Sequence, residues 1–210
     1  MQILMVSGSR NREGRTARAM EAIGKGVDKA GGKWESIFLP ELKIERCRQC
    51  NKDGYGICRS EYKCVIEDDF DSVNTKIIKS DVVVFANPVY FFDITESMRA
   101  FLDRLRRITP RPGPDLKGNF SLDLPGVSRF MPPKGATPAI GVCLAGGGGR
   151  GASHCCAVFE RYLPECGFDV VDMITLRRHN LEFKLPILEL TGEWLVTKPT
   201  SENNGLPDRK

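Results

Sequence analysis

Gln2-Ile3-Leu4-Met5-Val6 is a short apolar run that leads into the polar stretch Ser7-Gly8-Ser9-Arg10-Asn11-Arg12-Glu13-Gly14-Arg15-Thr16. The apolar run shows no helical period and is typical of a strand that is covered on both faces. Beyond the polar stretch, apolar residues recur at three- and four-residue steps, which predicts a helix with one buried face. That face carries Met20, Ile23, Val27 and Ala30. The chain is therefore expected to open with a strand, a loop and a helix.

The loop between this strand and helix suits a phosphate group. Backbone N–H groups at a helix start are unpaired and lie at the positive end of the helix dipole, and Ser, Thr and Arg side chains add charge-assisted hydrogen bonds. The loop contains neither G-x-G-x-x-G nor G-x-x-x-x-G-K-[ST], so a terminal monophosphate fits it better than a dinucleotide or a triphosphate. An ordinary capped helix start with solvated arginines is the alternative interpretation.

Composition narrows the class of protein. The chain has 210 residues, enough for one domain with a full core, and its net charge of +4 comes without the dense basic clusters that nucleic-acid binding needs. No apolar run approaches about 18 residues and no signal-peptide pattern is present, so we expect a cytoplasmic protein that does not contact membranes. In that reducing compartment, the eight cysteines indicate metal or redox chemistry rather than disulfides.

Four further strands are expected, at Lys33–Leu39, Val82–Ala86, Ala139–Ala145 and Phe168–Leu176. Helical patterns alternate with them, which predicts an α/β fold with a five-stranded parallel sheet in a three-layer sandwich. If the strand order is 2-1-3-4-5, ligands bind beyond the carboxyl ends of strands 1 and 3.

The expected domain covers residues 1–180. It includes a Cys-rich loop at 41–67 and a Pro/Gly-rich insertion at 109–134. A C-terminal extension at 181–210 follows, in which 185–196 is expected to form a short amphipathic helix.

Two more loops are predicted at the same edge of the sheet. Asn87–Asp93 contains three consecutive aromatic residues, on which a flat ligand could stack or a partner could dock; the alternative is that they fold onto the core. Gly146–Gly149 leaves the backbone bare, so N–H groups can approach a planar edge closely, unless the glycines form a flexible linker. Together with the phosphate loop, these features describe a flavin mononucleotide (FMN) site.

Three segments carry a family resemblance: Cys64-Val65-Ile66-Glu67-Asp68-Asp69, Asn87-Pro88-Val89-Tyr90 and Phe101-Leu102-Asp103-Arg104. Through them the chain resembles the flavodoxin-like NAD(P)H-dependent FMN reductases, and within these the iron-sulfur flavoproteins, from Met1 to about Leu176. It departs from the family pattern in the first loop, which lacks the usual Pro-Arg after the serine, and at Asn87, where the family commonly has Ser or Thr.

The resemblance implies which residues bind FMN. The phosphate would lie in the first loop, the ribityl chain and ring against the second, and the pyrimidine end of the isoalloxazine at the third. The implied residues are Ser9, Arg10, Asn11, Arg15, Thr16, Asn87, Pro88, Val89, Tyr90, Phe91, Phe92, Asp93, Ala145, Gly146, Gly147 and Gly148.

The Cys-rich loop carries four cysteines with gaps of two, seven and five residues: Cys47, Cys50, Cys58 and Cys64. Iron-sulfur flavoproteins place four cysteines in this region to hold a [4Fe-4S] cluster, so the resemblance implies the same here. Structural zinc and free thiols are the alternatives. The other four cysteines, Cys143, Cys155, Cys156 and Cys166, are interpreted as small core residues.

The expected function is that of an FMN-dependent oxidoreductase or electron-transfer flavoprotein, with NAD(P)H as a donor and a [4Fe-4S] cluster as relay. The alternatives are a cluster-free NAD(P)H-dependent FMN or quinone reductase and a zinc-stabilised flavin-binding module. No catalytic side chain is assigned, because the flavin carries the chemistry. A ferredoxin or another small electron carrier is the expected partner. A homodimer or homotetramer is expected from the exposed apolar surface at 90–92 and 185–188.

Overall fold

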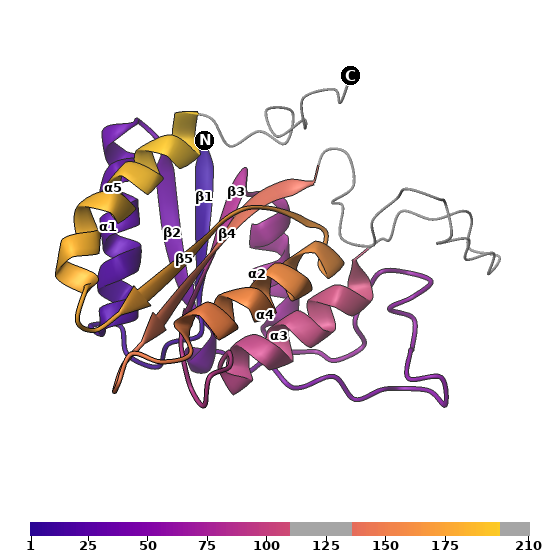
Figure 1. The fold of residues 1–210 in the computed structure, drawn as a ribbon. Helices are drawn as coiled ribbons and strands as arrows, with labels where there is room; N and C mark the ends of the chain where they lie inside the picture. The colour runs from indigo at the N-terminus through magenta and orange to yellow at the C-terminus, as the bar shows by residue number, and fades with distance from the viewer. Residues whose placement is uncertain (110–135, 198–210) are drawn as a thin grey trace, which may run out of the picture.

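The computed structural model describes residues 1–109 and 136–197. Its five strands form one parallel sheet in the order β2-β1-β3-β4-β5, which confirms the predicted fold and strand order (Figure 1). The strands are β1 (Gln2–Ser7), β2 (Lys33–Phe38), β3 (Val82–Pro88), β4 (Thr137–Ala145) and β5 (Phe168–Arg177). The helices are α1 (Arg15–Lys29), the short 3-10 helix η1 (Leu39–Glu41), α2 (Phe70–Ile78), α3 (Glu96–Ile108), α4 (Ala152–Glu165) and α5 (Leu181–Thr197).

Helices cover both faces of the sheet. Alternate residues of β1 point to opposite sides, so that Leu4 and Val6 pack with α2, α3 and α4, whereas Ile3 and Met5 pack with α1 and α5. Figure 1 shows α1 and α5 on one side of the strands and the other three long helices on the opposite side. The protein is thus the three-layer sandwich that the sequence predicts, with two separate apolar cores.

Strand β3 is longer than predicted, because it includes Asn87 and Pro88. The pairing of β3 with β1 ends at Ala86, opposite Ser7, while Asn87 and Pro88 pair only with β4. A proline lacks an N–H group and is tolerated where no strand lies on that side. The carboxyl end of β3 therefore projects beyond β1 toward the predicted ligand site.

Helix α5 also differs from the prediction. It begins at Leu181 instead of Leu185 and packs along α1, where a Cβ atom added at Gly26 would lie 1.8 Å from the Glu189 carbonyl oxygen. Only a residue without a side chain permits this close approach of the two helices. Ile187 is 55% exposed, as expected for the apolar segment 185–188, but Leu188 is fully buried against α1.

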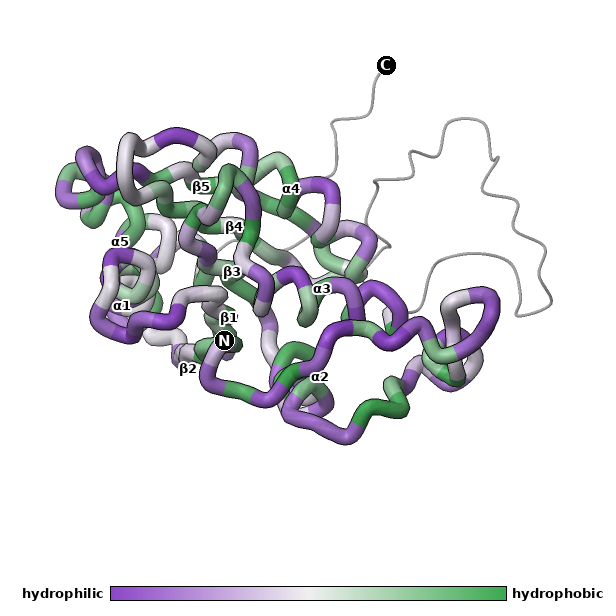
Figure 2. The backbone as a smooth tube through the Cα atoms, turned by 90° about the horizontal axis from the view of Figure 1, so that it is seen from below, coloured by the Kyte–Doolittle hydropathy of each residue, from purple (hydrophilic) through white to green (hydrophobic). Residues whose placement is uncertain are grey.

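The Cys-rich segment between η1 and α2 contains no further helix or strand. Figure 2 shows it extending outward beside α2 and α3, away from the strands. Of the Pro/Gly-rich insertion at 109–134, only Thr109 belongs to the described residues. Within the two described ranges, no helix is long and apolar enough to cross a bilayer.

Candidate functional site

The structure brings three loops together beyond the carboxyl ends of β1, β3 and β4. The N–H of Gly8 donates to the Ala86 carbonyl oxygen (2.9 Å), and a Cβ atom at Gly8 would lie 2.4 Å from Asn87 Oδ1. The loop before α4 contacts the aromatic loop, because a Cβ atom at Gly151 would lie 2.9 Å from the Cα atom of Phe92. Glycines at these two positions let the three loops approach one another closely.

The first loop forms a compact turn ahead of α1. Ser9 and Thr16 are buried, and Ser9 Oγ accepts a hydrogen bond from the backbone N–H of Asn11 (3.2 Å). Asn11 Oδ1 in turn accepts from the backbone N–H of Glu13 (2.8 Å). The residue that precedes the helix is Gly14, so no side chain caps the first turn. The N–H groups at the start of α1 are consequently open to an anion.

The arginines of this loop differ in whether their side chains form ion pairs within the protein. Arg10 forms an ion pair with Glu96, and Arg12 forms one with Glu41. Arg15 is exposed at the first position of α1, and its side chain forms no ion pair or hydrogen bond with the other described residues. It is therefore the arginine of the loop that is available to an incoming phosphate.

The aromatic loop is a tight turn with an unusual sequence. Tyr90 and Asp93 exchange two backbone hydrogen bonds (3.1 and 3.0 Å) across Phe91 and Phe92, whose φ angles are 49° and 66°. Such left-handed positions normally hold Asn and Gly, and a bulky residue there costs about 1–3 kcal/mol. Phe91 is 100% exposed and Phe92 is 54% exposed, so neither packs in the core. Strain without burial is a mark of a functional segment.

The polar residues of the second loop hold it in place. Asn87 is fully buried, and its Oδ1 atom accepts hydrogen bonds from Oγ1 (3.0 Å) and N–H (3.3 Å) of Thr95 at the start of α3. Asp93 forms an ion pair with Arg99 (2.9 Å). Pro88 and Val89 are half-buried beneath the turn. Asn87 and Asp93 thus contact the protein and orient the loop.

The third loop presents bare backbone. At Gly146, Gly147 and Gly148, an added Cβ atom would meet nothing within 4 Å. Gly149 closes the turn by donating to the Gly146 carbonyl oxygen (2.7 Å). Ala145 is buried at the end of β4. A planar group can therefore approach the backbone of residues 146–148 directly.

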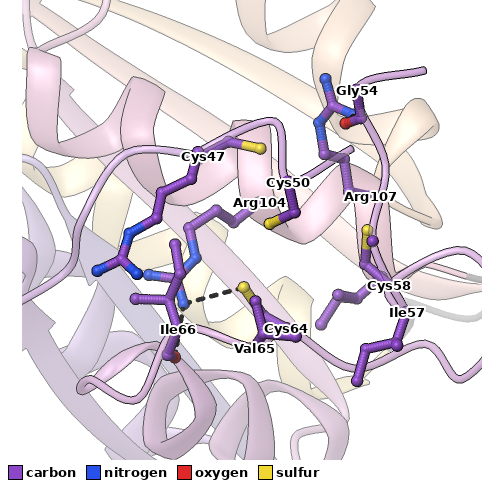
Figure 3. Close-up of a pocket in the computed structure, with 13 residues that line it drawn as sticks. Cys47, Cys50, Gly54, Ile57, Cys58, Cys64, Val65, Ile66, Arg104 and Arg107 are labelled. Atoms are coloured by element: carbon purple, nitrogen blue, oxygen red, sulfur yellow. Dashed lines mark hydrogen bonds between the residues drawn. The ribbon is translucent and has the colours of Figure 1, made fainter. Parts of the chain in front are cut away.

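The four cysteines of the Cys-rich segment line one cavity, although gaps of two, seven and five residues separate them in the sequence. Figure 3 shows the sulfur atoms of Cys47, Cys50, Cys58 and Cys64 around the same space, next to the Arg104 and Arg107 side chains of α3. The cavity has a volume of about 20 Å³, which is enough for about one water molecule. In residues 1–109 and 136–197, no three Cys, His, Asp or Glu side chains are grouped closely enough to hold a single metal ion.

Arg104 was not singled out as a site residue by its sequence. Its position in the last turns of α3 predicts a cation at the favourable end of a helix, but the structure buries it to 1% exposure. It donates to Asp68 Oδ2 (2.6 Å) and to Cys64 Sγ (3.3 Å), and it lies over the Phe70 ring at 4.2 Å. Arg104 therefore joins two of the three segments that carry the family resemblance. The sequence signal for its burial is its position on the apolar face of α3, together with Phe101, Leu105 and Ile108.

Asp68 is the carboxylate that compensates the buried Arg104. Burial by itself raises the pKa of Asp68, but hydrogen bonds from Arg104 and from the N–H groups of Glu45 and Phe70 outweigh this effect and hold the pKa below its ordinary value. Asp68 is consequently ionised at neutral pH. The ion pair ties the Cys-rich segment to α3.

The remaining cysteines have the core role that was predicted. Cys143, Cys155, Cys156 and Cys166 are all buried. Burial raises the pKa of the Cys143 thiol far above its ordinary value. These four residues therefore pack in the core.

A parallel sheet in this order, with three loops gathered at the β1 and β3 ends, defines the class of flavodoxin-like α/β proteins. Within that class, the model of the NADPH-dependent FMN reductase family matches residues 1–172. The chain belongs to this family. The resemblance inferred from the three sequence segments is confirmed.

Individual relatives agree with the family. An iron-sulfur flavoprotein of Archaeoglobus fulgidus is 30% identical over 120 residues, which cover 57% of this chain and 51% of that protein. A Bacillus subtilis protein named as an NAD(P)H-dependent FMN-containing oxidoreductase is 26% identical over 123 residues, or 58% of this chain and 62% of its own length. The matched part of the chain thus spans about half to three fifths of these relatives.

Solved structures agree in fold. An NAD(P)H:quinone oxidoreductase from Methanothermobacter marburgensis has a TM-score of 0.63 at 17% identity, covering 93% of this chain and 96% of that one. Identity at this level supports the shared fold alone.

The residues of these three loops fit FMN. The uncapped start of α1, with exposed Arg15, offers donors to a terminal phosphate. Open backbone at 146–148 and the exposed Phe91 and Phe92 rings offer donors and apolar surface to a flat ring system. FMN would supply partners for the N–H groups at the start of α1 and at 146–148, and it would cover the exposed aromatic rings.

Proposed function

We propose that the protein is an FMN-dependent oxidoreductase that takes electrons from NAD(P)H. The observation that carries this proposal is the meeting of three loops, one with an open helix start, one with strained exposed aromatics and one with bare backbone. When bound, FMN supplies the hydride and electron chemistry, as cofactors of this kind do. Membership of the NADPH-dependent FMN reductase family supports the same activity.

The chain's own residues bind and orient the flavin. Arg15, Ser9 and the first N–H groups of α1 hold the phosphate, while the N–H groups of 146–148 donate to the polar edge of the ring. Phe91 and Phe92 cover the flavin and limit the access of water. Asn87 positions the aromatic turn from below through Thr95. None of these side chains needs to transfer a proton.

We further propose that Cys47, Cys50, Cys58 and Cys64 hold a [4Fe-4S] cluster. Their common cavity, two guanidinium groups in its wall and a relative named as an iron-sulfur flavoprotein support this assignment. Structural zinc is the alternative occupant, and ligands about 2.3 Å from one ion would bring four sulfurs within about 3.8 Å of each other. No such group for a single ion occurs in the described ranges. Because the cavity holds only about 20 Å³, the Cys-rich segment would have to rearrange to hold either occupant.

The alternative is a reductase without a cluster, which the Bacillus subtilis relative favours because its name mentions FMN and NAD(P)H only. In that case the four cysteines are free thiols that pack the Cys-rich segment against α3. Both functions use the same three loops to bind the flavin.

One experiment separates these functions. The protein is purified without oxygen, and its absorption spectrum is recorded together with its FMN, iron, sulfide and zinc contents. Four irons and four sulfides with one FMN support the cluster, whereas FMN alone that NADPH reduces indicates the simple reductase. Replacing any one of the four cysteines by Ser should lower iron and leave FMN unchanged, and the buried control Cys143→Ser should lower neither.

The partners of this activity are also proposed. A ferredoxin or similar small electron carrier would exchange electrons at the Cys-rich segment, which lies on the outside of the fold (Figure 2). The exposed apolar residues Phe91, Phe183 and Leu190 support assembly into a homo-oligomer. The cytoplasmic location stays a prediction from the sequence.

A further inference from the structure

Arg104 places a full positive charge inside the wall of the cysteine cavity. Its side chain is 1% exposed, and that of its partner Asp68 is 6% exposed. Besides this ion pair, Arg104 donates to the carbonyl oxygens of Glu45 (3.2 Å) and Ile66 (3.3 Å), and to Cys64 Sγ (3.3 Å). One guanidinium therefore holds both ends of the Cys-rich segment and one of its four sulfurs.

Stability alone gives little reason for an arginine here. A buried ion pair is often no more stable than well-packed apolar residues of similar volume. The Nε atoms of Arg104, Arg106 and Arg107 are also buried without a hydrogen-bond partner among the described residues, and two of these arginines, Arg104 and Arg107, line the cavity. A buried donor without a partner destabilises the fold. The unpartnered donors of Arg104 and Arg107 suit an occupant of the cavity that is rich in hydrogen-bond acceptors.

We propose that Arg104 is a positioning residue for the iron-sulfur cluster, holding Cys64 in place and raising the cluster's reduction potential by hydrogen bonding to its sulfur. This inference rests on the cluster assigned under the proposed function. Reduction adds negative charge to a cluster, and hydrogen bonds to its sulfurs are among the factors that set its potential. A fixed buried cation with donors aimed at the site therefore favours the reduced form.

The competing role is purely structural, with Arg104 acting only as an anchor between the Cys-rich segment and α3. An anchor affects unfolding and iron content but leaves the potential of an assembled cluster unchanged. The potential is therefore the decisive measurement.

The test compares two variants that both lack the Asp68 carboxylate. Asp68→Asn keeps Arg104 and its bond to Cys64, while the double variant Arg104→Met, Asp68→Asn removes the guanidinium without leaving a buried carboxylate unpaired. Arg106→Met is a control that removes a charge from the same helix at a residue that does not line the cavity. Each protein is reconstituted without oxygen, and its cluster is titrated by electron paramagnetic resonance.

The equilibrium constant for reduction of the cluster should fall at least tenfold from Asp68→Asn to the double variant, which is a shift of 59 mV for one electron. Arg106→Met should stay within twofold of the wild type. If the double variant holds no cluster, Arg104→Lys replaces it in the comparison with the wild type. A lysine keeps the charge but loses the fork that reaches Cys64 and Asp68 together, so a smaller fall of at least twofold is expected.

Two different results would overturn the inference. If the reduction potential is the same with and without Arg104, the proposed cluster stands but Arg104 is only a structural anchor. If the wild-type protein contains no iron and sulfide after reconstitution, the proposed cluster is refuted, and this inference is refuted with it.

Discussion

Phe91→Asn should stabilise the flavin-free protein while weakening its hold on FMN. Phe91 has a φ angle of 49° and is 100% exposed, so its replacement relieves left-handed strain and loses no burial. A left-handed residue with a Cβ atom costs roughly 1–2 kcal/mol, and Asn tolerates this conformation better than most residues. A gain of about 1 kcal/mol corresponds to a Tm increase of about 2–4 °C for a chain of this size.

The loss of the ring should be seen in the flavin affinity. An aromatic contact contributes about 0.5–1.5 kcal/mol beyond its buried area, so the Kd for FMN should rise about 2- to 13-fold. Thermal unfolding followed by circular dichroism gives the Tm, and quenching of flavin fluorescence gives the Kd for FMN. Phe91→Leu is the matched control, because it removes the ring but keeps the strained backbone. It should weaken FMN binding without raising Tm.

Two outcomes would refute this account of the aromatic turn. A lower Tm in Phe91→Asn would mean that the ring stabilises the fold, as the core interpretation of the sequence holds. Unchanged FMN affinity in both variants would mean that the exposed ring serves a partner or a second copy of the chain.

Further expectations concern the phosphate loop, the buried ion pair and the assembly. Replacing both Ser9 and Thr16 by Ala should weaken FMN binding at least tenfold, because each hydrogen bond to a charged group contributes about 1.5–3 kcal/mol; an unchanged Kd by fluorescence titration would move the phosphate elsewhere. The lowered pKa of Asp68 means that its carboxylate stabilises the fold above its unfolded pKa of about 3.9 and loses this effect as pH falls through the lower folded value. The difference in unfolding free energy between wild type and Asp68→Asn should therefore be largest near pH 7 and shrink below about pH 4 in denaturant titrations, and a constant difference would contradict the assignment. Light scattering at micromolar concentration should give a dimer or tetramer, and a monomeric mass would end the idea that copies cover the exposed apolar residues.

The sequence was sufficient for the fold because the relevant signals are local. Val82–Ala86 is apolar at every position, and such a run is buried on both faces only in a sheet that helices cover on both sides. The alternation of such runs with helical periods then limits the topology to a few parallel arrangements. The loops that follow the strands could be assigned to one edge for the same reason.

The chemistry of the flavin loops was only partly contained in the sequence. The sequence indicated hydroxyls, arginines, aromatics and glycines in three loops, and the structure brings these loops together at one edge of the sheet. The sequence did not indicate which of the arginines form ion pairs within the protein. Arg10 and Arg12 find carboxylates at Glu96 and Glu41, far along the chain, and this leaves Arg15 free for a ligand among the described residues.

Only the tertiary structure decided the role of Arg104. In the sequence it is one of several arginines near the end of an amphipathic helix, and helix polarity explains cations there equally well. Its contacts with Asp68 and Cys64 span 36 and 40 residues of sequence. Such pairs arise when the Cys-rich segment folds back on α3, and no local pattern encodes that event. A buried charge needs a partner, and the partners of Arg104 are brought to it only by folding. The role of Arg104 is therefore seen only in the tertiary structure.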